Sequence, residues 1–328
     1  MAKGASISGF PEWLPSERVV EQRVIDTLRE VFELNGFIGI ETRAVEQGSS
    51  LLKKGETSKE IYLLSRLQEV GHESDTPIED RLGLHFDLTV PLSRYVVEHS
   101  GDLAFPFKRW QIQKVWRGER PQEGRFREFV QADIDVIGNG DLPDHYEVEL
   151  PLVMVSALER LREFGLPKAT VHANNRKLSE GFYRGLGLTD VEGVLREIDK
   201  LDKIGADEVA KLLVEGCGAD ENQARACLEL AELTAADGAE LSGKFDTLCE
   251  KHGIANDSEA YVLARQGLDT LAMIVDEAAR IRPDTSYCPA MRDCRNDRRN
   301  RWNQEPQHRQ GTSHTRNRRS LKSQDFNH

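Results

Sequence analysis

The sequence predicts an α+β fold, in which an antiparallel sheet is flanked by helices and followed by a helical module and a disordered tail. Apolar residues recur at helical spacing between residues 16 and 35, whereas apolar and polar residues alternate strictly from 129 to 136. A helical pattern rich in Ala, Leu and Glu covers residues 191–279. Residues 285–328 contain no Val or Ile and therefore lack the apolar side chains needed for a core.

The first predicted helix runs from Ser16 to Asn35. Ser16 is the expected N-cap, and Asn35-Gly36 is the expected end. The apolar face consists of Val20, Val24, Leu28, Val31 and Phe32.

A second helix is predicted from Asp144, as the cap, to Phe164, with Gly165 as the stop. A shorter helix is expected at Leu92–Val97, and Val171–Ala173 is expected to be a short strand.

Residues 105–138 predict a hairpin with two different faces. Polar or aromatic residues alternate with apolar ones along its second strand, so the first set shares one face and the second set forms a core face. The first face consists of Phe129, Gln131, Asp133 and Asp135, and the core face of Val130, Ala132, Ile134 and Val136. The first strand, Phe107 to Arg117, runs antiparallel to the second if residues 118–127 connect them. Alternation alone leaves two interpretations open, a solvated face and a binding site.

The residue types in this hairpin suit a nucleotide. A guanidinium can hold a phosphate oxygen through charge-assisted hydrogen bonds, and a flat ring such as Phe129 can stack on a purine. A carboxylate such as Asp135 can accept a hydrogen bond from an ammonium or an imidazole N–H. No Walker-type phosphate loop occurs in the sequence.

The segment WRGERPQEGRFREFVQADIDVIG, residues 116–138, resembles motif 2 of the class II aminoacyl-tRNA synthetases in the form used by histidyl-tRNA synthetases. The resemblance implies that Arg117 contacts the α-phosphate and the histidine carboxylate, and that Glu119 contacts the adenine amino group. It implies further that Arg125 reaches the outer phosphates and that Phe129 stacks on adenine. Gln131 and Asp135 would face the bound histidine.

Three other segments resemble the same family. HFDLTVPLSRYV, residues 85–96, is similar to its substrate segment, in which Asp87 would hold the α-amino group and Thr89 would assist. NNRKL (174–178) and IDKLDKIG (198–205) are similar to the start of its insertion domain, which contacts the tRNA acceptor arm. From the residues alone, Ile198, Leu201 and Ile204 are the apolar stripe of one helix.

The resemblance implies a domain order. Residues 9–170 would be the N-terminal part of the catalytic core, 171–255 a helical insertion domain, and 256–284 a return into the core. Residues 16–64 would hold motif 1, which forms a homodimer interface in relatives, although the usual proline is not evident in ETRAVE, residues 41–46. The implied activity is ATP-dependent conversion of L-histidine to histidyl-adenylate, with ATP as its Mg²⁺ complex, followed by transfer to tRNA(His).

The family's second signature, Arg-Gly-Leu-Asp-Tyr-Tyr-Thr-Gly, does not occur in this sequence, and neither motif 3 nor an anticodon-binding domain is evident. We therefore expect this polypeptide to be inactive or poorly folded. The alternative function is that of a non-catalytic paralogue, the regulatory subunit of ATP phosphoribosyltransferase. Such subunits usually have a degraded motif 2 and no insertion module, whereas both resemblances are present here.

Charge and cysteine content restrict the remaining possibilities. The chain carries a formal charge of −12, but residues 285–328 contribute +6, so residues 1–284 carry −18 and broad non-specific nucleic-acid binding is disfavoured. Five scattered cysteines indicate a reducing, cytoplasmic setting, and no apolar run is long enough for a membrane span.

The basic tail is either a disordered segment or the product of a shifted reading frame near codon 284. Cys288 and Cys294 have five residues between them, which is more than is usual for a zinc site, and His308 and His314 follow. The sequence therefore predicts no metal site made by protein side chains alone.

Overall fold

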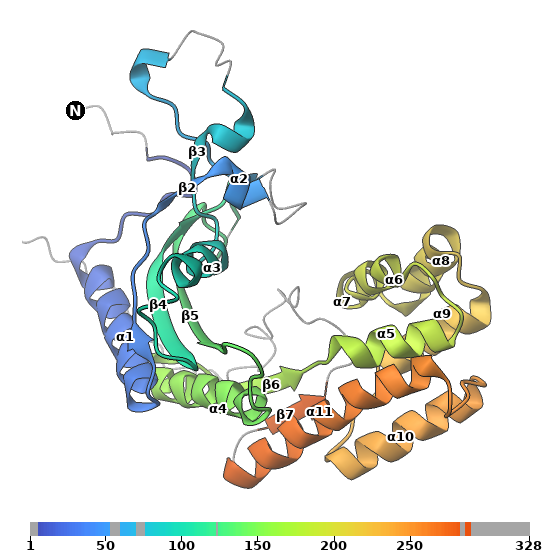
Figure 1. Cartoon of the computed structure of the whole chain (residues 1–328). Coiled ribbons are helices and arrows are strands. Elements are labelled where there is room, and N and C mark those ends of the chain that lie inside the picture. The colour runs from blue at the N-terminus through green and yellow to red at the C-terminus, as the bar shows by residue number, and fades with distance from the viewer. Residues whose placement is uncertain (1–5, 53–59, 70–75, 123, 283–285, 290–328) are drawn as a thin grey trace, which may run out of the picture.

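The computed structural model describes residues 6–52, 60–69, 76–122, 124–282 and 286–289. Its first part contains a sheet with helices on both sides (Figure 1). The elements in chain order are α1 (Pro15–Leu34), β1 (Ile38–Gly39), β2 (Val45–Gln47), α2 (Gly48–Leu51), η2 (Leu67–Glu69), η3 (Ile78–Asp80), β3 (Leu82–Leu84), α3 (Thr89–Glu98), β4 (Phe107–Trp116), β5 (Glu128–Ile137), α4 (His145–Arg160) and η4 (Leu161–Phe164).

The second part is helical and lies to one side of the sheet (Figure 1). It is joined to the first by β6 (Thr170–Ala173), which pairs in parallel with β7 (Ser286–Pro289). Its helices are α5 (Arg176–Gly185), α6 (Val191–Ile198), α7 (Leu201–Ile204), α8 (Ala206–Cys217), α9 (Glu221–Ala231), α10 (Gly238–Lys251) and α11 (Glu259–Ile281).

The predicted hairpin is confirmed as β4 and β5. The two strands pair in antiparallel register from Phe107 opposite Ile137 to Trp116 opposite Glu128. β1 joins β4 in parallel to give the order β1-β4-β5, while β2 and β3 form a separate antiparallel pair. The α+β prediction is therefore correct.

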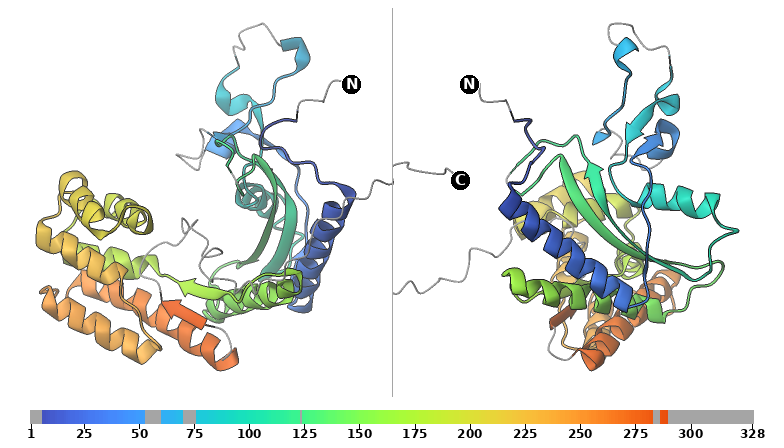
Figure 2. Two further views of the ribbon diagram at one scale, coloured as in Figure 1. Left: turned by 180° about the vertical axis from the view of Figure 1, so that it is seen from behind. Right: turned by 90° about the vertical axis from the view of Figure 1, so that its left-hand side faces the viewer.

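The two faces of the hairpin have different neighbours. Helices α1 and α3 lie on opposite sides of it (Figure 2). Trp110, Ile112, Ile134 and Val136 pack against a small apolar core supplied mainly by α1 and α4. The other face carries the polar residues, and Arg109 and Gln111 are fully buried there.

Helix α1 begins one residue earlier than the sequence suggested. Pro15 occupies the first helical position, where its fixed φ angle fits and its missing N–H costs nothing. Leu14 is the N-cap, and its backbone N–H donates to the Glu17 carboxylate at 2.9 Å. Ser16 as the N-cap was therefore wrong. Asn35 caps the C-terminus, and Gly36 follows with φ of 79°, as expected for a helix stop.

Helix α4 has Asp144 at its N-cap, as predicted, although that side chain makes no capping hydrogen bond. The α-helix ends at Arg160 and continues as a 3-10 turn to Phe164, where Gly165 adopts φ of 94°. Helix α3 and strand β6 confirm the shorter helix and strand predicted at residues 92–97 and 171–173.

The helical region has one continuous apolar core. Phe182, Leu213, Leu241 and Leu268 are each no more than 1% exposed, and they come from four different helices. Cys217, Cys227 and Cys249 are free and buried in the same core, and burial raises the pKa of the Cys227 and Cys249 thiols to about 12. They act as small apolar residues, as the sequence suggested.

Ile198, Leu201 and Ile204 do not form the stripe of one helix. Helix α6 ends at Ile198, and α7 begins at Leu201 after a two-residue turn. Ile198 and Leu201 are buried, but Ile204 is 42% exposed because the turn changes the direction of the chain. The single-helix expectation was therefore wrong.

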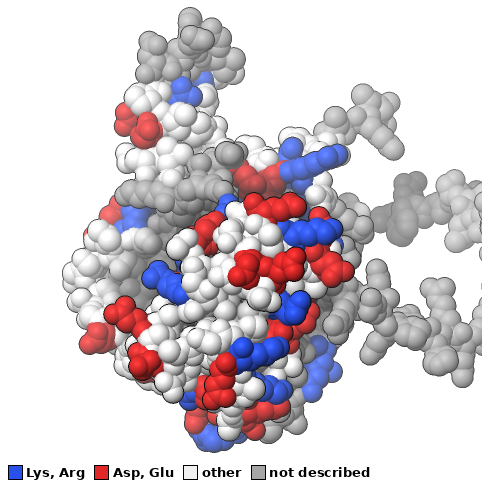
Figure 3. Space-filling view, turned by 90° about the vertical axis from the view of Figure 1, so that its right-hand side faces the viewer, with Lys and Arg blue, Asp and Glu red and all other residues white. Residues whose placement is uncertain are grey.

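Several charged residues on the helical region are paired with neighbours of opposite sign. Glu180 lies 2.6 Å from Arg184, and Glu240 lies 2.7 Å from Lys244, each four residues apart on its helix. Both signs are accordingly interspersed on the face seen in Figure 3. No helix of the described residues combines the length and apolar character required to cross a bilayer.

The expected disorder from residue 285 onward was wrong for Ser286–Pro289, which form β7. The backbone hydrogen bonds of a parallel ladder do not depend on apolar composition, so composition could not reveal this strand. Residues 290–328, with Cys294, His308 and His314, lie outside the described part of the chain.

Candidate functional site

The polar face of the hairpin is a ladder of paired side chains. The strand register places Arg109 opposite Asp135, Gln111 opposite Asp133, and Gln113 opposite Gln131. Side chains of one face alternate with those of the other, so all six lie on the same side of the sheet. The sequence assigned Gln131, Asp133 and Asp135 on the second strand to this face, whereas Arg109, Gln111 and Gln113 on the first strand were missed.

Arg117 lies at the end of this ladder and makes three contacts. Its Nε donates to the Phe86 carbonyl at 3.1 Å, and its Nη2 donates to Gln131 Oε1 at 3.3 Å. Its guanidinium carbon lies 5.0 Å from the centre of the Phe129 ring, within range for a cation–π contact. Its Nη1 has no partner in the described part of the chain and is available to an anion.

Asp87 lies close to Arg117 because Phe86, the residue before it, accepts the Arg117 hydrogen bond. Its side chain is buried at the N-terminus of α3, where Oδ1 accepts from the backbone N–H groups of Thr89 and Val90 at 3.2 and 3.3 Å. The positive end of the helix dipole favours a carboxylate at this position. Thr89 is exposed in the first turn of the helix.

Helix α3 is fixed to the sheet region by a buried ion pair. The Arg94 guanidinium contacts both carboxylate oxygens of Glu46 on β2, with Nε 2.9 Å from each. The Glu46 side chain is completely buried, and Arg43 lies 3.3 Å from it. This pair holds the helix whose N-terminus carries Asp87.

The loop between the strands contains the other predicted ATP ligands. Glu119 and Arg125 form an ion pair with one another, and Arg127 Nε donates to the Glu119 carbonyl at 3.0 Å. The backbones of Gln122 and Arg125 are bridged within the loop. The structure therefore brings Glu119 and Arg125 together, but each is occupied by the other.

Gln131 and Asp135 are committed to different partners. The Gln131 amide donates to both oxygens of Asp133, at 3.1 and 2.9 Å, while accepting from Arg117. Asp135 Oδ2 lies 2.5 Å from Arg109 Nη2. Burial raises the pKa of Asp135, and Asp133 adds to the rise, although Arg109 opposes it.

The first strand carried a signal that would have identified the missed residues. Arg109, Gln111 and Gln113 alternate with Trp110 and Ile112 in the sequence. Gln111 Nε2 donates to the Thr42 hydroxyl at 2.8 Å and to Gln113 Oε1 at 2.7 Å. Period-two alternation identifies the polar face of this strand, but only the strand pairing shows which residue faces Asp135.

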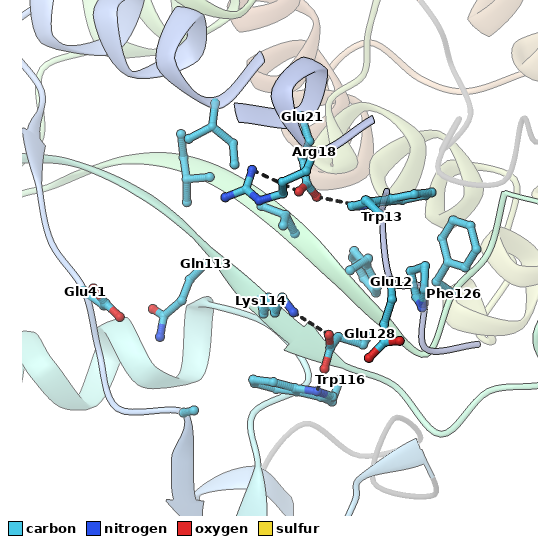
Figure 4. A pocket seen from close by; sticks show the side chains of 16 residues that line it. Glu12, Trp13, Arg18, Glu21, Glu41, Gln113, Lys114, Trp116, Phe126 and Glu128 are labelled. Atoms are coloured by element: carbon cyan, nitrogen blue, oxygen red, sulfur yellow. Dashed lines mark hydrogen bonds and ion pairs between the residues drawn. The ribbon is translucent and has the colours of Figure 1, made fainter. Parts of the chain in front are cut away.

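A cavity of about 680 Å³ lies mainly on the opposite face of the hairpin, beneath the N-terminal half of α1 (Figure 4). Trp13 and Phe126 meet edge to face beside it, with ring centres 6.1 Å apart. Glu128 accepts from Lys114 Nζ at 2.6 Å and from Trp116 Nε1 at 2.7 Å. Burial would raise the pKa of Glu128, but these two hydrogen bonds outweigh it and lower that pKa. Of the predicted site residues, Phe129 borders this cavity.

Within the described residues, no group of three or more His, Cys, Asp or Glu side chains is arranged to hold a metal ion. The Asp133 and Asp135 carboxylates are adjacent on the polar face, but Asp133 accepts from Gln131 and Asp135 pairs with Arg109. The polar face offers an anion site at Arg117 and acceptors at Asp87 and Asp135.

Comparison with known proteins gives a consistent family. The family model for histidyl-tRNA synthetase matches residues 9–288. The chain is 92% identical over 283 residues to histidine–tRNA ligase from Bifidobacterium longum subsp. infantis, in a match that spans 86% of this chain and 61% of that protein. The chain thus spans about three fifths of the length of that curated relative.

Comparison with solved structures also points to histidyl-tRNA synthetases. The structure resembles histidyl-tRNA synthetase from Nostoc sp. PCC 7120 with a TM-score of 0.72 and 31% identity, covering 89% of this chain and 62% of that one. It also resembles a structure titled ATP phosphoribosyltransferase regulatory subunit/histidyl-tRNA synthetase from Bacillus halodurans C. That likeness has a TM-score of 0.64 and 18% identity, covers 88% of this chain and 68% of that one, and shows a shared fold alone.

Proposed function

Because the chain belongs to the histidyl-tRNA synthetase family, we propose that its polar hairpin face is the histidine- and ATP-binding part of a histidine–tRNA ligase. The observation that carries the proposal is the Arg117 hydrogen bond to the Phe86 carbonyl. This bond holds the Arg117 guanidinium beside the segment that carries Asp87, which supports Arg117 as the cation for the α-phosphate and Asp87 as the ligand of the α-amino group. The substrates would be L-histidine, ATP with its Mg²⁺, and tRNA(His).

The proposed reaction begins with attack by a histidine carboxylate oxygen on the α-phosphorus of ATP. The new P–O bond forms as the bond to the bridging oxygen breaks, and pyrophosphate leaves with that electron pair. A hydroxyl at the tRNA 3′ end then displaces AMP from the carbonyl carbon. Arg117 would stabilise the negative charge that develops on the α-phosphate, and the protein would otherwise act by positioning its substrates.

The contacts among these side chains limit how the ligands would enter. The Arg117 guanidinium covers one face of the Phe129 ring, so adenine would stack on the other face or displace it. Glu119 and Arg125 would have to separate before one meets the adenine amino group and the other the outer phosphates. Gln131 would exchange a contact with Asp133 or Arg117 for one with histidine.

We include a homodimer in the proposal. The support is a set of exposed apolar side chains on α1 and β1, namely Val19, Val20, Leu34 and Ile38, which are between 49% and 73% exposed. Exposed apolar residues in adjacent elements favour association. Light scattering at increasing protein concentration would measure the mass, and a mass of one chain throughout would exclude the dimer.

Isothermal titration calorimetry with L-histidine and ATP tests the proposed site on the 328-residue chain. Arg117→Gln should weaken ATP binding by about a hundredfold, because a preorganised charge is lost. Arg160→Gln is the matched control, since Arg160 pairs with Glu30 on the surface between α4 and α1. A wild-type chain that binds neither ligand would overturn the proposal. Histidine-dependent ATP–pyrophosphate exchange then tests the expectation that this polypeptide is inactive.

A further inference from the structure

Arg109 is a fully buried arginine behind a residue of the proposed histidine site. It lies on β4 directly opposite Asp135 on β5, with its side chain 0% exposed and that of Asp135 39% exposed. Their contact is Nη2 to Oδ2, at 2.5 Å. The guanidinium thus lies at the back of the carboxylate, whose front is open to solvent.

Asp135 is the one counter-ion that contacts Arg109 among the described residues. Arg109 Nε and Nη1 are buried without a hydrogen-bond partner, and neighbouring Gln111 bonds to Thr42 and Gln113 instead. Burial lowers the pKa of Arg109, but a guanidinium keeps its proton under all ordinary conditions. A charged group in this position needs a nearby anion, because desolvation of an unpaired charge is costly.

The contact also determines which oxygen of Asp135 is available. Oδ2 faces Arg109, whereas Oδ1 has no partner in the described part of the chain. The charged groups acting on Asp135 are Arg109 on β4 and Asp133 on its own strand. Both oxygens of Asp133 accept from the Gln131 amide. Asp133 therefore acts on Asp135 through its negative charge alone and makes no direct contact with it.

We infer that Arg109 is a positioning residue for histidine recognition: it keeps the Asp135 carboxylate ionised and fixes its orientation, so that Oδ1 accepts the imidazole N–H of the substrate. The inference rests on the proposed function for the substrate, but the effect on Asp135 itself does not. Arg109 is too deeply buried to touch histidine and acts through Asp135.

The first measurement uses the chain without ligand. Carbon-13 NMR of the aspartate carboxyl groups would follow the titration of Asp135 in the wild type, in Arg109→Met and in Arg109→Lys, with Asp135→Asn used to assign the signal. Arg109→Met should raise the pKa of Asp135 because the opposing charge is removed, and Arg109→Lys should largely restore it. An unchanged titration in Arg109→Met would overturn the inference.

The second measurement is the pH dependence of binding. Histidine affinity of Arg109→Met should fall by roughly tenfold at neutral pH and recover at higher pH as Asp135 ionises, whereas ATP affinity should stay unchanged. Equal losses of histidine and ATP binding at every pH would indicate a merely structural role and would also overturn the inference. If Arg109→Met does not fold, Arg109→Gln supplies the same readouts, because it also removes the positive charge beside Asp135 while keeping a polar side chain in the buried position.

The two proposals fail in different ways. A wild-type chain that does not bind histidine contradicts the proposed function, and the ligand-free titration of Asp135 still decides whether Arg109 controls its ionisation.

Discussion

The sheet region and the helical region of this protein bury different kinds of side chain. The helical region, α5 to α11, buries apolar residues such as Phe182 and Leu213 in one continuous core. The sheet region buries Glu46, Arg109 and Gln111 in addition to a small apolar cluster between α1 and α4. Buried polar groups are costly unless they are paired, so a region that accumulates them is adapted to binding rather than to stability.

The difference extends to the way helices begin. Asp190, Asp220, Asp237 and Ser258 each cap a helix of the helical region with a side-chain hydrogen bond. In the sheet region, neither α1 nor α4 has such a bond. Local signals therefore determine the helical region more completely, whereas the sheet region depends on contacts between distant residues.

The largest expected effect lies in the apolar core. Phe182→Ala should lower the free energy of unfolding by about 4 kcal/mol, because it removes a buried ring and leaves a cavity. Phe182 is 1% exposed and meets the Phe245 ring at 6.0 Å. Urea denaturation followed by circular dichroism would measure the change. Val262→Ala on the exposed side of α11 is the control. Equal effects of the two variants would contradict the assigned core.

The sheet region should be sensitive to the loss of a charge. Asp135→Asn leaves Arg109 without its counter-ion, and we expect the free energy of unfolding to fall by about 2 kcal/mol. This is less than for a fully buried pair, because the Asp135 carboxylate is partly exposed and water weakens its interaction with Arg109. Adding Arg109→Met should recover part of the loss. Urea denaturation of the single and double variants, with Asp141→Asn as an exposed control, measures the coupling. Strictly additive losses would show that the two residues do not interact.

The smallest effect concerns an ion pair of the helical region. Burial would raise the pKa of Glu229, but hydrogen bonds from Lys251 and His252 outweigh it and lower that pKa below its usual 4.5. The carboxylate therefore stabilises the fold above about pH 4.5, and this stability is lost as the pH falls through the lowered value. Glu229→Gln should accordingly be less stable than the wild type at pH 7.

Denaturation at pH 7 and pH 3 would measure whether the difference between Glu229→Gln and the wild type shrinks in acid. Glu232→Gln, an exposed carboxylate in the next turn, should show little difference at either pH. If the stability difference between Glu229→Gln and the wild type is the same at pH 3 as at pH 7, Glu229 acts through packing rather than through charge.

Much of the hairpin and part of its chemistry could be predicted from the sequence. Strict alternation from Phe129 to Val136 predicted the second strand and its core face, and both are confirmed. The structure brings Arg117, Phe129 and Gln131 together, while their roles toward substrates stay predictions. The domain boundaries at 170, 255 and 284 also stay predictions, although α11 shares the core of the helical region.

Other features could not be read from the sequence. Nothing local to Arg109 indicates that Asp135 is its partner, because the pair is created by the strand register across 26 positions. The hydrogen bonds from Gln111 and Gln113 to Thr42 likewise join residues that are far apart in the sequence. Residues 286–289 looked like the start of a disordered tail, and only pairing with β6 makes them a strand.

The sequence by itself determined the family, the two strands of the hairpin with their faces, the positions of α1, α3 and α4, and the helical character of residues 191–279. These features depend on periodicity and on residue types that act within a few positions of one another. Only the tertiary structure decided that Arg109 lies buried behind Asp135, and that Glu119 and Arg125 form an ion pair with one another. Electrostatic pairing acts through space and depends on burial, so it is defined only once distant segments are packed together.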